Sequence, residues 1–218
     1  MKASFWHACW ERNSLGFHQT AFHPFLAQYL LPRITAEHQS VFVPLCGKSD
    51  DMVWLAEYME VVGSELSDIA CRDFFAEKQL PVTLTEHGGF KCYQHQNVSL
   101  WQGDFFQLEA KSFRPFDWIY DRAALIALPQ EMQQVYVEHL TSFMGPETTL
   151  FLISVEFPQQ EMSGPPFAVG ADEINSLFAD FEVECLTRHP LPDKVFAQRV
   201  FDVSYLTETL YIIRQKAR

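Results

Sequence analysis

Short apolar runs alternate along the chain with longer segments in which apolar and polar residues are mixed. The short runs are rich in β-branched and aromatic residues and predict strands, with a loop closing the third, at residues 40–44, 61–65, 98–106, 116–122 and 148–157. The longer segments predict helices at residues 50–59, 67–78, 129–144 and 172–179. Strand and helix therefore alternate at the spacing of βαβ units, which predicts a parallel sheet.

Local signals support two of these helices. Ser67 is a candidate N-cap for the second helix, and Phe74 and Phe75 are candidate core residues on it. Pro129 lies in the first turn of the third helix, and Gly145 follows its end. These signals predict where both helices begin and where the third one stops.

The last part of the chain has a different pattern. Three apolar segments, at residues 181–187, 195–206 and 209–215, are typical of an antiparallel closing edge. We therefore expect a doubly wound α/β fold with helices on both faces of the sheet. Because no repeat or linker divides the chain, we expect one domain over residues 1–218, in which residues 1–38 form an extension of the core at 39–218.

Composition and charge narrow the class of protein. Of 218 residues, 48% are hydrophobic and 20% are charged, which is typical of a globular chain with a sizeable core. The net charge of −12 opposes binding to nucleic acid or anionic membranes, since both rely on Lys and Arg. The chain has no apolar stretch of about 18 residues and no apolar secretory signal at its N-terminus. We expect a cytoplasmic protein that binds neither nucleic acid nor membranes.

The cysteines predict neither a metal site nor a disulfide framework. There are five of them, an odd number, and they are widely scattered without zinc-binding spacing. His7, Cys9, His18 and His23 crowd the N-terminus, but they lack the CxxC or HExxH spacing of a zinc site. We expect reduced thiols and no bound metal.

The stretch VPLCGKSDD, at residues 43–51, ends like a phosphate loop. Such a loop also needs a glycine five residues before Gly47, where this chain has Phe42. Asp50 and Asp51 would moreover place two carboxylates beside a polyanion. A dinucleotide fingerprint fails as well, because it uses two or three glycines and Gly47 has no second glycine near it. The loop is therefore not predicted to bind phosphates.

An acidic residue ends the second predicted strand. Glu65 lies eighteen residues after Gly47, where a carboxylate can accept both hydroxyls of an adenosine ribose. S-adenosylmethionine has a ribose and no phosphate, and its sulfonium cation suits a negatively charged protein. A solvated acid at a strand end is the alternative for Glu65. Asp104, after the third strand, would meet the adenine amino group or serve as a loop or cap residue.

Six stretches together resemble one protein family. They are FWHACWERNSLGFHQ, VFVPLCGKSDDMVWLAE, VVGSELS, WQGDFF, YDRAALIALP and GPPF. In this order they resemble the thiopurine S-methyltransferase family in its bacterial form. The resemblance implies a class I methyltransferase fold, with a seven-stranded, mostly parallel Rossmann-like sheet, an antiparallel last strand and an N-terminal helical cap. It also implies S-adenosylmethionine as methyl donor, S-adenosylhomocysteine as product, and a small thiol or selenol as acceptor.

The resemblance also implies which residues form the site. Cofactor contacts fall on Trp10, Leu45, Glu65, Asp104, Phe105 and Arg122. The acceptor pocket is implied to include Phe17, Arg122 and Phe167. Trp10 and Leu45 would supply apolar cover, and Glu65 would bind the ribose. The planar guanidinium of Arg122 would pair with a carboxylate on cofactor or substrate. Core packing is the alternative for the aromatic residues, and a structural ion pair is the alternative for Arg122.

The implied chemistry is direct displacement, in which the acceptor sulfur attacks the sulfonium methyl group in line. An aromatic thiol is already acidic, so we expect no essential base or nucleophile, and alignment alone contributes about 7–11 kcal/mol. Cys46 precedes a helix start, where the pKa of a thiol can fall, but no base is identifiable beside it. We therefore expect Cys46 not to be catalytic.

Other functions stay open at this point. Methylation of selenium or tellurium species would use the same machinery. A non-catalytic adenosyl-binding module and an NAD-dependent oxidoreductase are the more distant alternatives, and the shortage of glycines opposes the second of these. We expect a monomer whose partner is a small molecule.

Overall fold

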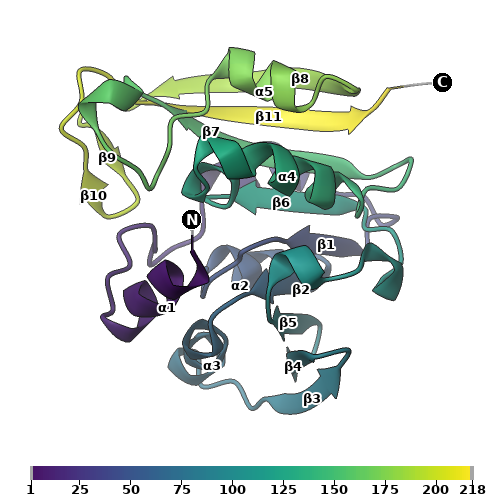
Figure 1. Ribbon diagram of the computed structural model, residues 1–218. Helices are drawn as coiled ribbons and strands as arrows, with labels where there is room; N and C mark the ends of the chain where they lie inside the picture. The colour runs from purple at the N-terminus through teal and green to yellow at the C-terminus, as the bar shows by residue number, and fades with distance from the viewer. Residues whose placement is uncertain (1, 217–218) are drawn as a thin grey trace. The chain divides into compact units, whose positions relative to one another are not determined.

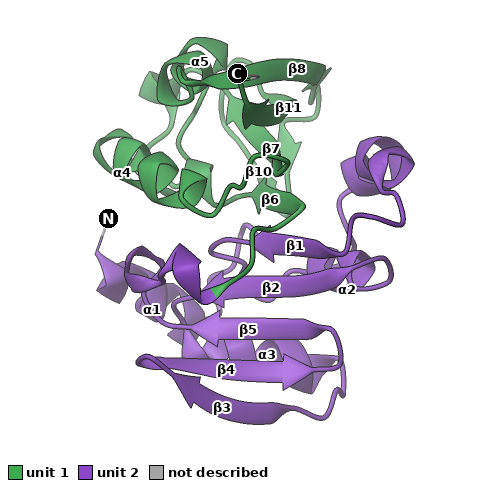
Figure 2. Ribbon diagram, turned by 90° about the vertical axis from the view of Figure 1, so that its right-hand side faces the viewer, with its two compact units in different colours: residues 1, 113–218 green, residues 2–112 purple. Residues whose placement is uncertain are grey.

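The structure is a computed structural model that describes residues 2–216, and these residues divide into two compact units. The first unit spans Lys2–Ser112, and the second begins at Phe113 and includes the rest of the described chain (Figure 2). Each unit has its own sheet strands and its own buried apolar side chains.

Within residues 2–112, five sheet strands lie in the order β3-β4-β5-β2-β1 (Figure 2). Their bounds are β1 Ser40–Val43, β2 Glu60–Glu65, β3 Thr83–His87, β4 Phe90–His95 and β5 Val98–Gln102. Strands β1, β2 and β5 are parallel, with Val61 opposite both Val41 and Val98. Strands β4 and β3 continue the sheet as antiparallel strands. The central strands β1 and β2 are apolar and buried over most of their length, as parallel strands usually are.

The first unit has three α-helices and several shorter helical turns. They are α1 Ala3–Glu11, α2 Asp51–Leu55 and α3 Asp68–Glu77, a π-helical turn at Leu26–Leu30, and 3₁₀ turns at Leu31–Arg33, Phe105–Gln107 and Ala110–Ser112 (Figure 1). Ser67 caps α3 as predicted, because its Oγ accepts the N–H of Ala70 at 3.4 Å. Phe74 and Phe75 are buried, also as predicted. Helix α2 is shorter than the helix predicted at 50–59, since turns replace it after Leu55.

In the second unit, four sheet strands lie in the order β6-β7-β11-β8. Their bounds are β6 Trp118–Arg122, β7 Thr149–Glu156, β8 Phe181–Pro190 and β11 Thr207–Gln215. Strands β6 and β7 are parallel, and β11 is antiparallel to both β7 and β8. The unit also contains helices α4 Gln130–Thr141 and α5 Ala171–Leu177, 3₁₀ turns at Leu125–Ala127 and Gln159–Glu161, and a hairpin of β9 Val195–Phe196 with β10 Arg199–Val200 (Figure 1).

Most of the predicted elements are confirmed, including the α/β class and the antiparallel last strand. The first unit has five sheet strands, and the second has four besides the separate β9–β10 hairpin. This is two strands more than the seven expected, and the two additional strands are β3 and β4. The prediction of an edge strand at 195–206 is wrong, because that segment forms the separate β9–β10 hairpin. The expectation of one domain stays a prediction. Within residues 2–216, no helix is both long enough and apolar enough to cross a membrane.

Candidate active site

The loop after β1 makes a tight turn with little space beside the glycine at its centre. Leu45 and Gly47 both have left-handed backbone conformations, with φ of 47° and 56°. A Cβ on Gly47 would lie 3.3 Å from Cζ2 of Trp10 and 3.8 Å from Cε2 of Phe17. The backbone N–H of Cys46 donates to the carbonyl of Ser64 at 2.9 Å, which ties this loop to β2. Glycine is therefore favoured at position 47 by its left-handed conformation and by the close approach of Trp10.

Glu65, at the end of β2, holds two loops together with its carboxylate. Its Oε2 accepts the N–H of Gly47 at 2.9 Å, and its Oε1 accepts the N–H of Ser67 at 2.7 Å. The side chain is buried, and burial raises the pKa of Glu65 to about 7, although the N–H groups of Ser67 and Gly47 act to lower it. The solvated-acid alternative for Glu65 is therefore excluded.

Aromatic rings of the N-terminal segment cover the glycine turn. Trp10 lies in α1 and is buried, while Phe17 lies in the loop after α1 and is half-buried. The two rings meet edge to face with their centroids 5.8 Å apart, and Trp6 makes a similar contact with Phe17 at 6.0 Å. The predicted helical cap thus has a helix, α1, and places two of the expected site residues against Gly47.

Asp104 and Phe105 follow β5, and the main chain beside them is bonded to Glu65. The N–H of Gly103 donates to the carbonyl of Glu65 at 2.8 Å. Asp104 is exposed, and its Oδ1 accepts the N–H of Phe106 at 3.1 Å, so this carboxylate caps a 3₁₀ turn. Phe105 is only 2% exposed and stacks on Phe42 at 6.2 Å between centroids. Both residues therefore have structural contacts of the kind named as their alternatives.

The two remaining expected residues, Arg122 and Phe167, belong to the second unit. Arg122 ends β6, and its Cζ lies 5.7 Å from the centroid of the Phe196 ring in β9. Phe167 is half-buried, and its N–H donates to the carbonyl of Ile126 at 2.7 Å. Its ring covers Gly164, where an added Cβ would lie 2.6 Å from Cε1 of Phe167. Arg122 directly precedes the segment that follows β6, and Phe167 is hydrogen-bonded to that segment.

The polar and thiol groups of the loop after β1 have structural partners. Lys48, the lysine of the Gly-Lys-Ser stretch, is buried and pairs with Glu77 of α3 at 2.5 Å. Cys46 is buried as well, and its pKa is raised well above the ordinary value by burial and by the nearby Glu65. A thiol with a raised pKa is a poor nucleophile, which agrees with the expectation that Cys46 is not catalytic. Among the described residues, no group of three or more His, Cys, Asp or Glu side chains could hold a metal ion.

The chemistry of this site fits an adenosyl group. A carboxylate has about four acceptor positions, so with two taken by backbone N–H groups, Glu65 keeps capacity for the two hydroxyls of a ribose. The rings of Trp10 and Phe17 offer apolar cover beside the turn. Since Lys48 is engaged with Glu77, the loop is not built for phosphates.

Two buried, hydrogen-bonded residues of the second unit, Asp121 and Tyr136, are not evident from the sequence. Asp121 stands out there only as the neighbour of Arg122, yet its carboxylate is buried and accepts the hydroxyl of Tyr136 at 2.7 Å. The signal for Asp121 is an acid inside an apolar run, whereas nothing in the sequence connects Tyr136 to it. Such a contact depends on how α4 packs against β6.

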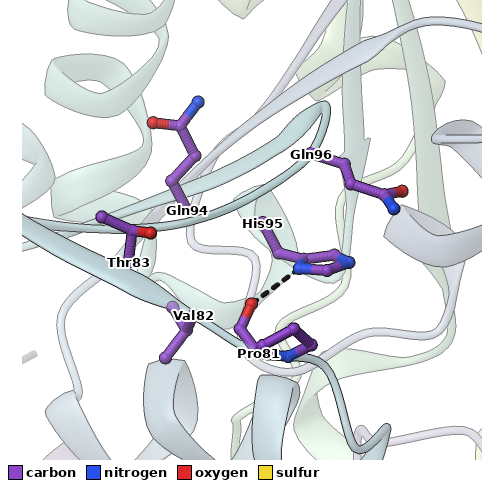
Figure 3. A pocket seen from close by; sticks show the side chains of 6 residues that line it. All are labelled: Pro81, Val82, Thr83, Gln94, His95 and Gln96. Carbon is purple, nitrogen blue, oxygen red and sulfur yellow. Dashed lines mark hydrogen bonds between the residues drawn. The ribbon is translucent and has the colours of Figure 1, made fainter.

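A pocket of about 440 Å³ lies elsewhere in the first unit, around the start of β3 and the end of β4. Its lining is Pro81, Val82, Thr83, Gln94, His95 and Gln96. Figure 3 shows the imidazole of His95 directed at Pro81, where Nδ1 donates to the carbonyl oxygen at 2.6 Å. None of the expected site residues lines this pocket, so it is separate from the candidate site.

Comparison with solved structures establishes the fold. The chain is similar to a SAM-dependent methyltransferase from Anabaena variabilis ATCC 29413, with a TM-score of 0.66 at 14% identity, covering 98% of this chain and 95% of that chain. It is also similar to DhpI, solved as a complex with SAH, with a TM-score of 0.59 at 13% identity over 99% of this chain and 96% of that one. These likenesses confirm the class I methyltransferase fold.

Comparison of sequences identifies the family. The family described as Thiopurine S-methyltransferase (TPMT) matches residues 1–216. The chain is 39% identical to the thiopurine S-methyltransferase of Pseudomonas aeruginosa strain UCBPP-PA14, over 99% of this chain and 100% of that protein. It is 41% identical to the enzyme of the same name from Vibrio parahaemolyticus, over 94% of this chain and 97% of that protein. The chain belongs to the thiopurine S-methyltransferase family.

Proposed function

We propose that this protein transfers a methyl group from S-adenosylmethionine to the sulfur of a small aromatic or heterocyclic thiol of the thiopurine type. The observation that carries the proposal is the buried carboxylate of Glu65, which is hydrogen-bonded to a glycine turn covered by Trp10 and Phe17. An adenosyl donor is suited by an acceptor for ribose hydroxyls, by a turn with glycine at its centre and by apolar rings beside that turn. Membership of the family supports the same chemistry.

The residues of the first unit act by binding and by excluding water. S-adenosylmethionine, when bound, supplies an electrophilic methyl group on a sulfonium sulfur. Glu65 would hold the ribose, and Leu45 and Trp10 would shield the donor from solvent. Alignment of the two reacting groups then contributes about 7–11 kcal/mol. Because an aromatic thiol ionises readily, no side chain is needed to remove its proton.

The residues of the second unit are proposed to recognise the acceptor or the carboxylate of the donor. The guanidinium of Arg122 is planar and permanently charged, so it is suited to a carboxylate or to a thiolate on a heterocycle. Its neighbour Phe196 keeps one face of the guanidinium against an aromatic ring. Phe167 offers a half-buried ring for stacking.

Calorimetric titration with S-adenosylhomocysteine tests the donor site. Glu65→Ala is expected to weaken binding of S-adenosylhomocysteine. Arg122→Ala is expected to weaken binding of S-adenosylhomocysteine or of the acceptor. The circular dichroism of both variants should stay unchanged. Matched controls are Glu86→Ala on exposed β3 and Arg114→Ala on an exposed loop, neither of which should alter affinity. Unchanged affinity and unchanged turnover in both site variants would remove these residues from the site.

The acceptor is identified by a transfer assay with labelled donor. Aromatic thiols, aliphatic thiols and selenols are compared at equal concentration, and aromatic or heterocyclic thiols are expected to give the highest kcat/KM. A clear preference for selenols would replace the proposed acceptor with selenium species. Tight binding of S-adenosylhomocysteine with no transfer to any acceptor would favour a non-catalytic module.

We also propose that the protein acts as a monomer in the cytoplasm. The five cysteines, all of which lie among the described residues, are free rather than paired in disulfides. Free thiols are typical of a reducing compartment. Light scattering after size exclusion tests the first point, since a mass near twice 25.3 kDa would contradict it.

A further inference from the structure

The buried carboxylate of Asp121 stabilises the turn that follows β6. Asp121 is fully buried, and its Oδ1 accepts the N–H groups of Ala124 and Leu125 at 3.3 and 3.2 Å. Its Oδ2 accepts the hydroxyl of Tyr136, in α4, at 2.7 Å. The two oxygens of the carboxylate therefore act differently, since Oδ1 shapes the turn and Oδ2 fixes the side chain to α4.

The turn held in this way is unfavourable by itself. Ala123 has a φ of +64°, in the left-handed region, which costs a residue other than glycine about 1–2 kcal/mol. A second residue of α4 holds the far end, because Nε2 of the buried Gln133 donates to the carbonyl of Leu128 at 2.9 Å. Helix α4 is thus hydrogen-bonded to both ends of the segment 121–128.

Two residues that have a role in the proposed function, Arg122 and Phe167, are attached to the segment 121–128. Arg122 lies directly between Asp121 and the strained Ala123, so the path of its backbone depends on the turn. Phe167 is attached from outside, since its N–H donates to the carbonyl of Ile126 at 2.7 Å. A change in the turn would therefore move both residues together.

We propose that Asp121 and Tyr136 form a positioning pair, called here the 121–136 pair, that places Arg122 and Phe167 for methyl transfer. The inference rests on the proposed function, because it gives Arg122 and Phe167 a role with the ligands. Neither member of the 121–136 pair needs to touch a ligand. Both act through the turn at 123–126.

Removing one hydroxyl tests the pair. Tyr136→Phe keeps the ring of Tyr136 in the core and deletes its hydrogen bond to Asp121, which leaves the turn free to relax. Since small displacements of binding groups lower rates strongly, we expect a loss of about 10-fold in kcat/KM. Tyr211→Phe is the matched control, because it removes a buried hydroxyl from β11 of the same unit and should leave kcat/KM unchanged.

A conservative change at the other partner provides a rescue. In Asp121→Asn the side-chain oxygen still accepts from Ala124 and Leu125, and the amide can donate to the hydroxyl of Tyr136. We expect this variant to keep kcat/KM within about threefold of the parent, whereas Asp121→Ala falls at least as far as Tyr136→Phe. Equal losses in Asp121→Asn and Asp121→Ala, with Tyr136→Phe active, would overturn the pair.

Double-mutant cycles separate positioning from a general loss of stability. If the 121–136 pair acts through Arg122 and Phe167, Tyr136→Phe should have a smaller effect on kcat/KM in the Arg122→Ala and Phe167→Ala backgrounds. An undiminished effect of about 10-fold in both backgrounds, or a lowered Tm with unchanged kcat/KM, would overturn the inference. If Arg122→Ala and Phe167→Ala themselves leave kcat/KM unchanged, the proposed roles of those residues fail and the inference fails with them. If those two variants lose activity and Tyr136→Phe does not, only the inference fails.

Discussion

Glu65 is expected to contribute more stability to the ligand-free protein on acidification and at the same time to weaken its binding of S-adenosylhomocysteine. Burial raises the pKa of Glu65 to about 7 from an ordinary value of 4.5. The folded protein therefore holds this proton more tightly than the unfolded chain does. The stability that the proton contributes is fully present below pH 4.5 and is lost as the pH rises through 7.

The size of both effects follows from these two pKa values. Between about pH 5.5 and pH 8, proton linkage at Glu65 changes the free energy of unfolding by about 2 kcal/mol, in favour of the lower pH. Binding changes in the opposite direction, because the ionised carboxylate is the better acceptor for two ribose hydroxyls. At about pH 5.5 only about 3% of the free protein has Glu65 ionised, so affinity should be about 30-fold weaker than at pH 8.

Urea unfolding and calorimetric titration at both pH values measure the two effects, with Glu65→Gln as the comparison. The amide does not titrate, so the difference between parent and variant isolates Glu65 from other groups such as Asp121, whose pKa burial raises to about 6. The variant should bind weakly at both pH values and lose the pH dependence of affinity. Equal pH dependence in parent and variant, or an affinity that stays constant from about pH 8 to about pH 5.5 in the parent, would refute the reasoning.

Three further predictions concern the loop and its cover. Gly47→Ala is expected to destabilise the fold by about 1–2 kcal/mol in urea unfolding, because φ is +56° and the Trp10 ring lies 3.3 Å from the added Cβ; an unchanged midpoint would contradict the preference for glycine at this position. Cys46→Ser should keep at least half of the parent kcat, and a loss of more than about 100-fold with intact donor affinity would restore a role for the thiol. Amide exchange in residues 5–25 should slow when S-adenosylhomocysteine is added, whereas equal protection with and without it would argue against a cover that opens.

The apolar pattern is enough to predict the elements that form the buried sheet. Strands β1, β2 and β7 are short apolar runs because both of their faces are covered, and such runs stand out in a sequence. Strand β3 is not predicted because all of its residues are exposed, so the pattern contains no apolar face. The turn after it does carry a signal in the sequence, since the pair Gly88 and Gly89 separates two strand-forming runs. In the structure both glycines have positive φ.

The position of the candidate site can be predicted from the sequence, whereas the packing of its side chains cannot. An acid at the end of β2 and a glycine turn after β1 can be placed from spacing, and the structure joins them by a hydrogen bond. The packing of Phe17 on Gly47 cannot be predicted, because it depends on how the segment after α1 folds back. The bond between Tyr136 and Asp121 joins residues fifteen positions apart and depends on helix packing in the same way.

Glu65 and Asp121 show why a buried acid at a strand end is more informative than its sequence position implies. Each lies at the end of a parallel strand, each is buried with a raised pKa, and each accepts two backbone N–H groups from turns. A buried charge is costly unless it is hydrogen-bonded, so the turns and the carboxylates stabilise one another. The two differ in what remains: Glu65 keeps acceptor capacity for a ligand, whereas Asp121 uses its second oxygen on Tyr136. Because of this difference, we propose Glu65 as a binding residue that also stabilises a loop, whereas Asp121 stabilises the turn that follows Arg122.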